Sequence, residues 1–320
     1  MSEHHLILGG CGFIGRHVGV MLARAGHRVT LASRHPLPFP PPSDVVDQIG
    51  FCTLELGTAA WDSLVEDVDV VHHYAWGSIP ASANSNPGGD LRINVTSSID
   101  LLDALRRRGG GRVVFASSGG TVYGKVKETP VSEEHPMSPI TAYGAGKVAA
   151  EIYLGLYRSM YGLDCRIARI ANPYGAGQDI ERGVGAVTTF LHHALNGLPI
   201  TIWGTGEAVR DYIHISDLAN CLVTLADAPR NDTYIFNVAS GVGISLNQIV
   251  LELEARLGCV LNVSRTETRA FDVPVSVLDI SRANAVLGWA PRLSFSEGIA
   301  LTLEDLRKKV HFSTLRWGSW

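Results

Sequence analysis

The sequence is poor in charge for its length. Of its 320 residues 18% are Asp, Glu, Lys or Arg, against about 25% in ordinary globular proteins, whereas 46% are hydrophobic and the net charge is −4. Intrinsic disorder requires low hydrophobicity and high net charge, and is therefore excluded. Basic residues form no run longer than Arg106–Arg108, which we interpret as the last turn of a helix. Nucleic acid is therefore not an expected partner.

Cysteine is scarce, and long apolar runs are absent. The five cysteines lie far apart and form no C-x-x-C pair, which is typical of reduced thiols in the cytoplasm. No apolar run reaches the ~18 residues of a membrane-spanning helix, and Leu6–Leu8 leads into glycines rather than into the core of a signal peptide. The sequence thus predicts a cytoplasmic protein without a membrane partner. The cysteines are Cys11, Cys52, Cys165, Cys221 and Cys259.

Strand-like and helix-like stretches alternate along the first half of the chain. Short apolar strands separated by amphipathic helices are typical of a parallel sheet with helices on both faces. We therefore predict an α/β fold with a Rossmann-type doubly wound parallel sheet and a smaller C-terminal α+β substrate-binding domain. The expected strands are His5–Leu8, Arg28–Ala32, Val68–His72, Arg112–Ala116, Asp164–Ile170, Asp211–Ile215, Thr233–Val238 and Val260–Arg265. The expected helices are Arg16–Ala25, Val95–Arg107, Ala145–Tyr161, Ser216–Ala228, Ser245–Leu257, Ser281–Leu287 and Ser296–Leu306.

A glycine-rich turn follows the first expected strand directly. Gly9, Gly12 and Gly15 are spaced G-x-x-G-x-x-G between that strand and a helix. The first glycine permits a tight bend, the second lets a pyrophosphate approach the backbone, and the third lets the helix pack closely on the sheet. The helix N-terminus then offers unpaired N–H groups to the phosphates. This arrangement predicts a dinucleotide-binding site.

The end of the second strand distinguishes the two nicotinamide cofactors. An acidic residue there accepts hydrogen bonds from the ribose 2′-OH of NAD, but this sequence has Ser33 and Arg34. A hydroxyl and a guanidinium can both bind a 2′-phosphate, so NADP(H) is favoured, while NAD(H) remains possible. The alternative is that Arg34 is an ordinary exposed loop arginine.

Tyr143 and Lys147 lie one helical turn apart and share a helix face. A neighbouring ammonium group lowers the pKa of a phenol and makes it an acid/base near neutrality. The Y-x-x-x-K pattern is common, and a surface pair is the alternative. An upstream strand that ends in Ser117, Ser118 and, a little later, Thr121 favours the catalytic interpretation, because such hydroxyls can bind a sugar oxygen beside the tyrosine.

Together these motifs resemble the extended short-chain dehydrogenase/reductases of the nucleotide-sugar epimerase/dehydratase family. The resemblance covers nearly the whole chain, and it implies an NAD(P)-dependent enzyme that acts at C4 of a nucleoside-diphosphate sugar. Its segments are Gly9–Gly15, His73-Tyr-Ala75, Asn94, SSGGTVYG at 117–124, YGAGK at 143–147, Asn172-Pro-Tyr-Gly175, Trp203-Gly-Thr-Gly206, RDYIHISD at 210–217, Arg269-x-x-Asp272 and Leu287-Gly-Trp-x-Pro291.

The resemblance also implies roles for individual residues. Tyr143 would be the acid/base at the sugar 4-oxygen, and Lys147 would hold the nicotinamide ribose and depress the pKa of the tyrosine. Further cofactor contacts are implied for Gly9, Gly12, Phe13, Ile14, Gly15, Glu55, Leu56, Tyr74, Ala75, Asn94, Ser117 and Pro173. Ser33 and Arg34, which are predicted above to bind a 2′-phosphate, depart from the family, because they replace the acid expected at this position. Substrate contacts are implied for Ser118, Tyr123, Asn172, Arg210 and Arg269, the last three at the pyrophosphate. Aromatic packing explains Tyr123 equally well.

One departure from the family concerns the catalytic hydroxyl. The family usually carries a catalytic Ser or Thr three residues before Val122, where this sequence has Gly119. The role then falls to Thr121, to Ser118 or to a water, with Thr121 preferred. Either hydroxyl can instead merely cap the turn between strand and loop.

Three reactions of the family are possible outcomes. A dehydratase is disfavoured, because Gly120-Thr121 replaces the Asp-Glu pair that such enzymes carry. A reductase that uses NADPH on a 4-keto-6-deoxyhexose is preferred because of Ser33 and Arg34. A 4-epimerase similar to UDP-glucose 4-epimerase, with tightly bound NAD, is the alternative. A non-catalytic NADP-sensing protein is a minor alternative that the tyrosine–lysine pair disfavours.

The organisation of the chain follows from the same resemblance. Residues 1–172, with 207–238 contributing back, are expected to bind the dinucleotide, whereas 173–206 and 239–320 are expected to bind the nucleotide sugar. A homodimer through the helices Val95–Arg107 and Ala145–Tyr161 is the family expectation.

Histidine pairs at 4–5, 72–73 and 192–193 resemble metal ligands in number only. None has the i,i+4 spacing with a glutamate that a helical zinc motif requires. We interpret them as sheet-edge and helix-face histidines, and expect no metal.

Overall fold

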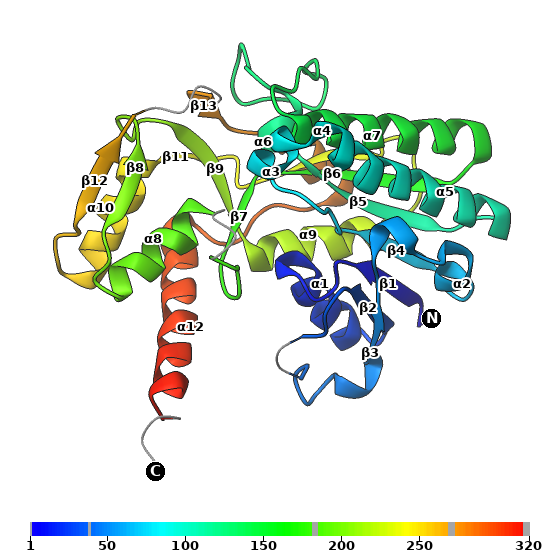
Figure 1. Ribbon diagram of the computed structural model, residues 1–320, viewed down its shortest axis with the longest axis horizontal. Coiled ribbons are helices and arrows are strands. Elements are labelled where there is room, and N and C mark those ends of the chain that lie inside the picture. The colour runs from blue at the N-terminus through cyan, green and yellow to red at the C-terminus, as the bar shows by residue number, and fades with distance from the viewer. Residues whose placement is uncertain (1, 38–39, 181–184, 268–272, 316–320) are drawn as a thin grey trace.

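A parallel sheet of seven strands forms the larger part of the molecule (Figure 1). The computed structural model describes residues 2–37, 40–180, 185–267 and 273–315, with the backbone alone from residue 308. The strand order is β10-β6-β5-β4-β1-β2-β3, and each neighbouring pair is parallel. This confirms the predicted Rossmann-type class. The strands are β1 (His4–Leu8), β2 (Arg28–Ser33), β3 (Ile49–Thr53), β4 (Val70–His73), β5 (Arg112–Ser118), β6 (Asp164–Ile170) and β10 (Ile235–Val238).

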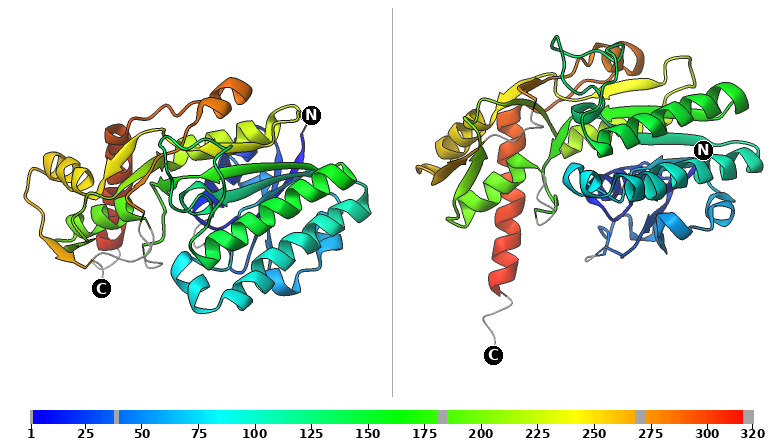
Figure 2. Two further views of the ribbon diagram at one scale, coloured as in Figure 1. Left: turned by 90° about the horizontal axis from the view of Figure 1, so that it is seen from above. Right: turned by 45° about the horizontal axis from the view of Figure 1, so that its top comes forward.

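Helices cover both faces of this sheet (Figure 2). Side chains alternate along β1, so that Ile7 packs into one helical layer while Leu6 and Leu8 pack into the other. The first layer contains α1 (Phe13–Arg24) and α9 (Ile215–Asp227), and the second contains α5 (Ser97–Arg108) and α7 (Ala142–Tyr161). Because both faces are covered, most positions of the central strands are buried. Several of these positions are nevertheless polar, among them His72 and His73 of β4 and Arg169 of β6.

The chain reverses its progress across the sheet beside β1. The strands β1, β2 and β3 follow one another outward, and the chain then returns to place β4 on the opposite side of β1. At the carboxyl end of β1, Leu8 therefore lies between Ala32 of β2 and His73 of β4. Doubly wound sheets bind ligands in the crevice at such a reversal point. The glycine-rich turn after β1 and the loop after β4 both begin there.

The histidine pairs occupy central strands as well as a helix. His4–His5 lies in β1 and His72–His73 lies in β4, each with a hydrogen-bonded strand on both sides. The prediction of sheet-edge positions is therefore wrong, because the return of the chain to β4 encloses β1. His192 and His193 do lie on a helix, α8 (Ala186–Leu195), as predicted.

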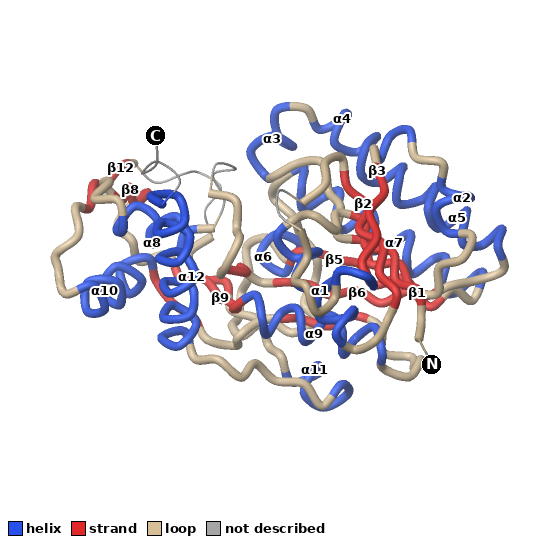
Figure 3. The backbone as a smooth tube through the Cα atoms, turned by 90° about the horizontal axis from the view of Figure 1, so that it is seen from below, coloured by secondary structure: helices blue, strands red, loops and turns tan. Residues whose placement is uncertain are grey.

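A smaller region of mixed sheet and helices lies beside the large sheet (Figure 3). The strand β9 (Val209–His214) runs parallel to β7 (Asn172–Tyr174) and β13 (Val275–Ser276) and antiparallel to β11 (Gly243–Ser245). The strand β8 (Ile200–Trp203) pairs with β12 (Val263–Thr266). The helices α8, α10 (Leu246–Leu257) and α12 (Phe295–Leu315) pack around a separate apolar core that includes Leu191, Leu253 and Ile299. This region has the α+β character that the sequence predicts.

The elements that the sequence did not reveal are short or half-exposed. They include β3 at the sheet edge, β8 and α8, while α12 continues beyond the predicted end at Leu306. The division into two domains at the predicted boundaries stays a prediction. Among the described residues, no helix combines the length and the hydrophobicity that crossing a membrane requires. The remaining helices are η1 (Val46–Gln48), η2 (Leu56–Thr58), α2 (Trp61–Val65), α3 (Pro80–Ser85), α4 (Pro87–Asp90), η3 (Leu91–Thr96), α6 (Gly119–Val122) and α11 (Ser281–Leu287).

Candidate active site

The glycine-rich turn has the geometry that a pyrophosphate requires. Gly9 has a φ of +78°, and a Cβ there would lie 2.9 Å from the backbone nitrogen of Ala75. A Cβ at Gly15 would collide with the carbonyl oxygen of Gly9. Gly12 precedes α1 without any side-chain cap, so the N–H groups of the first turn, beginning at Phe13–Ile14, are left for a ligand. The turn therefore fits a dinucleotide, as predicted.

The carboxyl end of β2 carries hydrogen-bond donors and no carboxylate. The Oγ of Ser33 accepts the backbone N–H of Cys11 at 3.0 Å. Arg34 is exposed and has no hydrogen bond or ion pair within the described part of the chain. Beyond β3, Glu55 is exposed and Leu56 is buried, with its carbonyl oxygen accepting the hydroxyl of Ser97 at 2.9 Å.

The loop after β4 is held by internal hydrogen bonds. The backbone N–H of Gly77 donates to Oδ1 of Asn94 at 2.6 Å, and Nδ2 of Asn94 donates to Oδ1 of Asp90 at 2.8 Å. The hydroxyl of Ser78 donates to the same carboxylate. Asn94 is 1% exposed, and both ends of its amide are engaged. Asn94 thus fixes the loop after β4, and its contact with the cofactor stays a prediction.

Tyr74, also predicted to contact the cofactor, lies beside the glycine-rich turn. Its hydroxyl is hydrogen-bonded to Nδ1 of His72 at 2.7 Å, and burial raises its pKa well above the ordinary value. Its ring packs into the layer of α1 and α9, below the sheet edge. The backbone from Tyr74 to Ala75 adjoins Gly9, and the cofactor contacts of both residues stay predictions.

Tyr143 and Lys147 share a face of α7 next to the ends of β4 and β5. Lys147 is 2% exposed, and its Nζ donates to the carbonyl oxygen of Ala116 at 2.7 Å. The same nitrogen lies 5.8 Å from the ring centroid of Tyr143 and 3.7 Å from that of Trp76. Burial lowers the pKa of Lys147 to about 7, against the opposing effect of nearby carboxylates. Trp76 was not predicted, because no motif marks it.

The hydroxyl residues at the end of β5 have separate surroundings. Ser117 is buried and donates to the carboxylate of Glu151, and its predicted cofactor contact stays a prediction. The half-buried Thr121 donates weakly to the carbonyl oxygen of Ser118, at 3.4 Å. Gly119 is buried beneath Leu278, whose side chain would collide with any Cβ at this position. Where the family usually has a catalytic Ser or Thr, this protein thus has a glycine that packs against Leu278.

Tyr123 belongs to a buried network behind the site. It is 1% exposed, donates to Oδ1 of Asn237 at 2.7 Å, and accepts a hydrogen bond from Arg169 at 3.0 Å. The guanidinium of Arg169 in turn pairs with the carboxylate of Glu151 at 2.7 Å. The hydroxyl of Tyr123 is thus satisfied inside the core, as the packing interpretation expects, and its substrate contact stays a prediction.

A cavity of about 370 Å³ lies in the smaller region, next to β7, β8 and α8. Three of the predicted residues, Asn172, Pro173 and Arg210, line it. Nδ2 of Asn172 donates to the carbonyl oxygen of Asp211 at 2.9 Å. The predicted Arg269 lies outside the described residues. Further lining residues that we did not predict are Thr189, Phe190, Thr201, Trp203, Tyr212 and Leu246.

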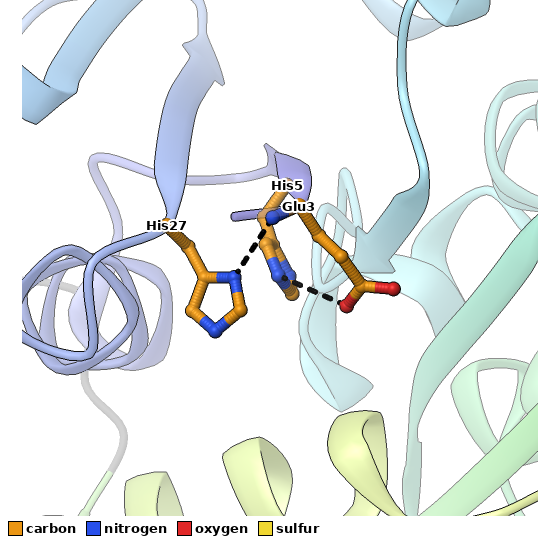
Figure 4. A group of neighbouring side chains, drawn as sticks. All are labelled: Glu3, His5 and His27. Atoms are coloured by element: carbon orange, nitrogen blue, oxygen red, sulfur yellow. Dashed lines mark hydrogen bonds and ion pairs between the residues drawn. The ribbon is translucent and has the colours of Figure 1, made fainter. Parts of the chain in front are cut away.

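Glu3, His5 and His27 gather at the opposite, amino-terminal edge of the sheet (Figure 4). The Nε2 of His5 lies 3.7 Å from the carboxylate of Glu3, and Nδ1 of His27 accepts the backbone N–H of Glu3 at 3.2 Å. The guanidinium of Arg112 lies 3.6 Å from the same carboxylate, and its positive charge would repel a divalent metal ion there. The cluster is thus poorly suited to a metal ion, and the expectation of no metal stays a prediction.

The fold and the site define a class of protein. A doubly wound sheet with an uncapped glycine-rich turn, and a tyrosine–lysine pair beside it, is the arrangement of a nicotinamide-dependent Rossmann oxidoreductase. A sequence model of the NAD dependent epimerase/dehydratase family matches residues 5–239. The chain belongs to this family, and it is an enzyme.

Individual relatives match almost the whole chain. UDP-glucose 4-epimerase of Mycolicibacterium smegmatis is 34% identical over 95% of this chain and 98% of its own length. The dTDP-4-dehydro-6-deoxyglucose reductase of Escherichia coli is 33% identical with the same coverage of both chains. The structure of UDP-glucose 4-epimerase from Thermotoga maritima with UDP-glucose has 30% identity and a TM-score of 0.89, covering 96% of this chain and 99% of that one. The Thermus thermophilus UDP-glucose 4-epimerase complex with NAD has 30% identity and a TM-score of 0.84, covering 95% and 99%.

Proposed function

We propose that this enzyme transfers hydride between a nicotinamide cofactor and C4 of a nucleoside-diphosphate sugar. The observation that carries the proposal is the pairing of Tyr143 with the buried Lys147 beside the carboxyl ends of β4 and β5. The glycine-rich turn supports the cofactor half of the proposal. The relatives support the sugar half, because one is named for UDP-glucose and the other for dTDP-4-dehydro-6-deoxyglucose.

Tyr143 moves the proton in this reaction. When a 4-keto sugar is reduced, its phenol donates a proton to O4, and in the reverse direction its phenolate accepts that proton. The bound nicotinamide supplies or takes the hydride. The ammonium group of Lys147 stabilises the phenolate, so that proton transfer is possible near neutral pH. Because the pKa of Lys147 lies at about 7, its charge is sensitive to its surroundings in the same range.

Thr121 is our candidate for the hydroxyl that binds O4, with Ser118 as the second. Gly119 cannot serve, because it has no side chain and Leu278 covers it. The hydrogen bond of Thr121 to Ser118 is 3.4 Å long and is easily exchanged for one to a ligand. This assignment leaves the proton relay with Tyr143 and gives the hydroxyl an orienting role.

The nucleotide end of the substrate is assigned to the cavity beside β7 and β8. Asn172 and Arg210 line it and supply an amide and a guanidinium, which suit a pyrophosphate. Phe190 and Trp203 supply aromatic surface for a base. We keep Arg269 as a third predicted phosphate ligand. The proposed domain division follows, with 173–206 and 239–320 holding the nucleotide sugar.

For the net reaction we propose NADPH-dependent reduction of a nucleoside-diphosphate 4-keto-6-deoxyhexose. The supporting observation is the pair Ser33 and Arg34 at the end of β2, where a hydroxyl and an exposed guanidinium suit a 2′-phosphate. Cells keep NADP mostly in its reduced form, NADPH. This favours a reductase, which delivers a hydride to the sugar once, over an epimerase, which takes a hydride from the sugar and returns it.

A 4-epimerase with tightly bound NAD is the second candidate. The observation that favours it is the likeness to UDP-glucose 4-epimerases, of which one was solved with UDP-glucose and another with NAD. An epimerase oxidises C4 and reduces it again from the other face, so its cofactor is not consumed. The two candidates therefore differ in whether nucleotide leaves the protein.

One experiment separates the candidates. Purified protein is denatured and the released nucleotide is assayed, and native protein is then tested with NADPH and dTDP- or UDP-linked 4-keto sugars. An empty protein that oxidises NADPH with such a sugar supports the reductase. Stoichiometric NAD(H), together with interconversion of UDP-glucose and UDP-galactose, supports the epimerase. A protein that neither binds a nicotinamide nucleotide nor acts on any of these sugars would falsify the proposal.

We further propose that the enzyme works in the cytoplasm as a homodimer. All five cysteines are free thiols, which is consistent with a reducing compartment. The outer face of α7 carries exposed apolar side chains that a second copy would cover. Immunolocalisation in intact cells tests the compartment, and a location outside the cytoplasm would overturn it.

A further inference from the structure

Trp76 lies against the ammonium group of Lys147. It follows β4 in the loop that Asn94 fixes, and its ring centroid is 3.7 Å from Nζ of Lys147. This distance is well within the ~6 Å over which an aromatic face attracts a cation. The ring of Phe115 lies 4.7 Å from the same nitrogen. Lys147 is thus held between aromatic rings and the carbonyl oxygen of Ala116.

The helix that carries Lys147 leaves space for this contact. A Cβ at Gly146 would lie 3.2 Å from Cζ2 of Trp76 and 3.2 Å from Oδ2 of Asp90. A glycine between Tyr143 and Lys147 therefore lets the indole rest directly on α7. The ring of Trp76 also meets that of Tyr143 edge-on, with 6.1 Å between centroids. One indole thus touches both members of the pair.

Within the part of the chain that the structure describes, the indole nitrogen of Trp76 forms no hydrogen bond that would orient the ring. Its Nε1 is buried and has no hydrogen-bond acceptor within the described ranges. Buried indole N–H groups usually find a partner, because an unsatisfied donor is unfavourable. No hydrogen bond of the indole N–H to a described residue therefore orients the ring. The contact that orients it is the one between the ring face and the ammonium group of Lys147.

We propose that Trp76 is a positioning residue for Lys147: its ring face fixes the ammonium group beside Tyr143 and stabilises its charged form. The other groups that face Lys147 are Glu151 on α7, Asp90 on α4 and His73 on β4. The carboxylates also stabilise the charge, whereas burial opposes it. Only the effect of Trp76 on turnover rests on the proposed function. Its effect on Lys147 itself does not.

Lysine NMR tests the contact without any substrate. The chain has only five lysines, Lys125, Lys127, Lys147, Lys308 and Lys309, so that Lys147→Met assigns the signal of interest. In the wild type we expect the Hε signals of Lys147 to be shifted upfield by the indole. Trp76→Leu should abolish this shift and lower the pKa of Lys147 from about 7 to about 6, whereas Trp76→Phe should retain part of both.

A matched control and a smaller change guard against general disruption. Trp289→Phe alters another buried tryptophan that lacks an indole partner within the described residues, and it should leave Lys147 unchanged. If Trp76→Leu does not fold, Gly146→Ala serves instead, because its methyl group would lie 3.2 Å from Cζ2 of Trp76 and so pushes the indole away from α7 by a few tenths of an ångström. An Hε signal without upfield shift in the wild type, or a pKa of Lys147 that stays constant or rises in these variants, overturns the proposal.

Kinetics extend the test to turnover. A fall of the pKa to about 6 lowers the charged fraction of Lys147 at pH 7 from about a half to about a tenth, so kcat of Trp76→Leu should fall about fivefold at pH 7 and little at pH 5.5. KM for the nucleotide sugar should stay within about twofold, because Trp76 acts through Lys147. A wild type inactive on every nucleotide sugar refutes the proposed function but leaves the NMR result valid. Equal losses of kcat at both pH values would refute the positioning role.

Discussion

The backbone N–H of Cys11 donates to the Oγ of Ser33 across 3.0 Å, which ties the glycine-rich turn to the end of β2. Because this hydroxyl acts as an acceptor, its own proton remains available to a ligand on the ribose side. Arg34 follows directly and is exposed. In the binding mode that we propose, this end of β2 would meet the 2′-position of the adenosine ribose. It offers donors, which suit a phosphate, and no acceptor carboxylate for a 2′-hydroxyl.

Ser33→Asp should reverse the cofactor preference. The new carboxylate accepts hydrogen bonds from the 2′-hydroxyl of NADH and repels the 2′-phosphate of NADPH. We expect NADPH affinity to fall at least ~10-fold, because a repulsion between two negative charges replaces the hydrogen bond from Ser33. NADH affinity should rise, because its 2′-hydroxyl gains a charge-assisted hydrogen bond. Titration calorimetry of the purified protein with both nucleotides measures the two dissociation constants.

Arg34→Ala is the companion to this substitution. It should weaken NADPH binding several-fold and leave NADH binding unchanged, because only NADPH carries the 2′-phosphate that the guanidinium would meet. A wild type that binds NADH as well as NADPH or better would contradict the assignment of both residues.

Tyr143→Phe should retain cofactor binding and lose turnover. The substitution removes the hydroxyl that carries the proton but keeps the ring against Trp76. General acid–base catalysis contributes about 10²–10⁴-fold, so kcat should fall by that factor while the cofactor dissociation constant changes less than about twofold. Steady-state kinetics and fluorescence titration give the two numbers.

The control for this variant is Tyr161→Phe, at the exposed end of the same helix. It makes the same chemical change far from the pair and should leave kcat unaltered. Near-normal turnover in Tyr143→Phe would show that another group carries the proton.

Local motifs explain why the sequence alone predicted much of the fold and of the site. The glycine-rich turn, the order of strands and helices, and the pair Tyr143–Lys147 all depend on residues that are close in the sequence. The side chains that pack against these motif residues come from segments distant in the sequence. Trp76 reaches Lys147 and Leu278 reaches Gly119 only through the packing of distant segments.

The hydrogen-bond partners of three predicted site residues could not be predicted from motifs either. Asn94, Ser117 and Tyr123 are polar residues at positions where a ligand contact was expected, yet each is satisfied by a buried partner inside the protein. A single sequence shows that a side chain can form hydrogen bonds, but not which partner the fold provides. β3 was missed for a related reason, because an edge strand with exposed positions lacks the apolar pattern of the central strands.

Buried histidines should make the fold sensitive to acid. Burial lowers the pKa of His73 to about 3 and that of His5 and His214 to about 4. The unfolded chain binds protons at these sites below about pH 6.5, whereas the folded chain does not. Stability is therefore complete above pH 6.5 and falls toward pH 4, by about 1.4 kcal/mol per pH unit for each histidine. Urea unfolding at pH 7.5, 6.0 and 5.0 measures this slope.

Substitution of His73 tests how much this histidine contributes to the pH dependence of stability. His73→Asn keeps a polar side chain near Ser98, to which His73 is hydrogen-bonded at 2.8 Å, but it cannot take up a proton. We expect lower stability at pH 7.5 and a shallower slope between pH 6.5 and 4, while His35→Gln, at an exposed position, should keep the slope of the wild type. A slope that is identical in all three proteins would show that His73 does not titrate as its burial implies.

The outer face of α7 should form the interface of a homodimer. Ile152, Leu156 and Met160 lie along this face and are 60%, 41% and 62% exposed, although α7 packs its other side on the sheet. An exposed apolar stripe on a well-packed helix is typical of an association surface, and two-fold symmetry would pair it with itself.

The double substitution Ile152→Glu/Leu156→Glu places two carboxylates per chain in that interface and should raise the dimer dissociation constant by at least ~100-fold. Light scattering during gel filtration should then give a dimer for the wild type and for Val260→Glu, a 91% exposed control outside α7, and a monomer for the double variant. A monomeric wild type at micromolar concentration would contradict the assignment, and so would a double variant that stays dimeric.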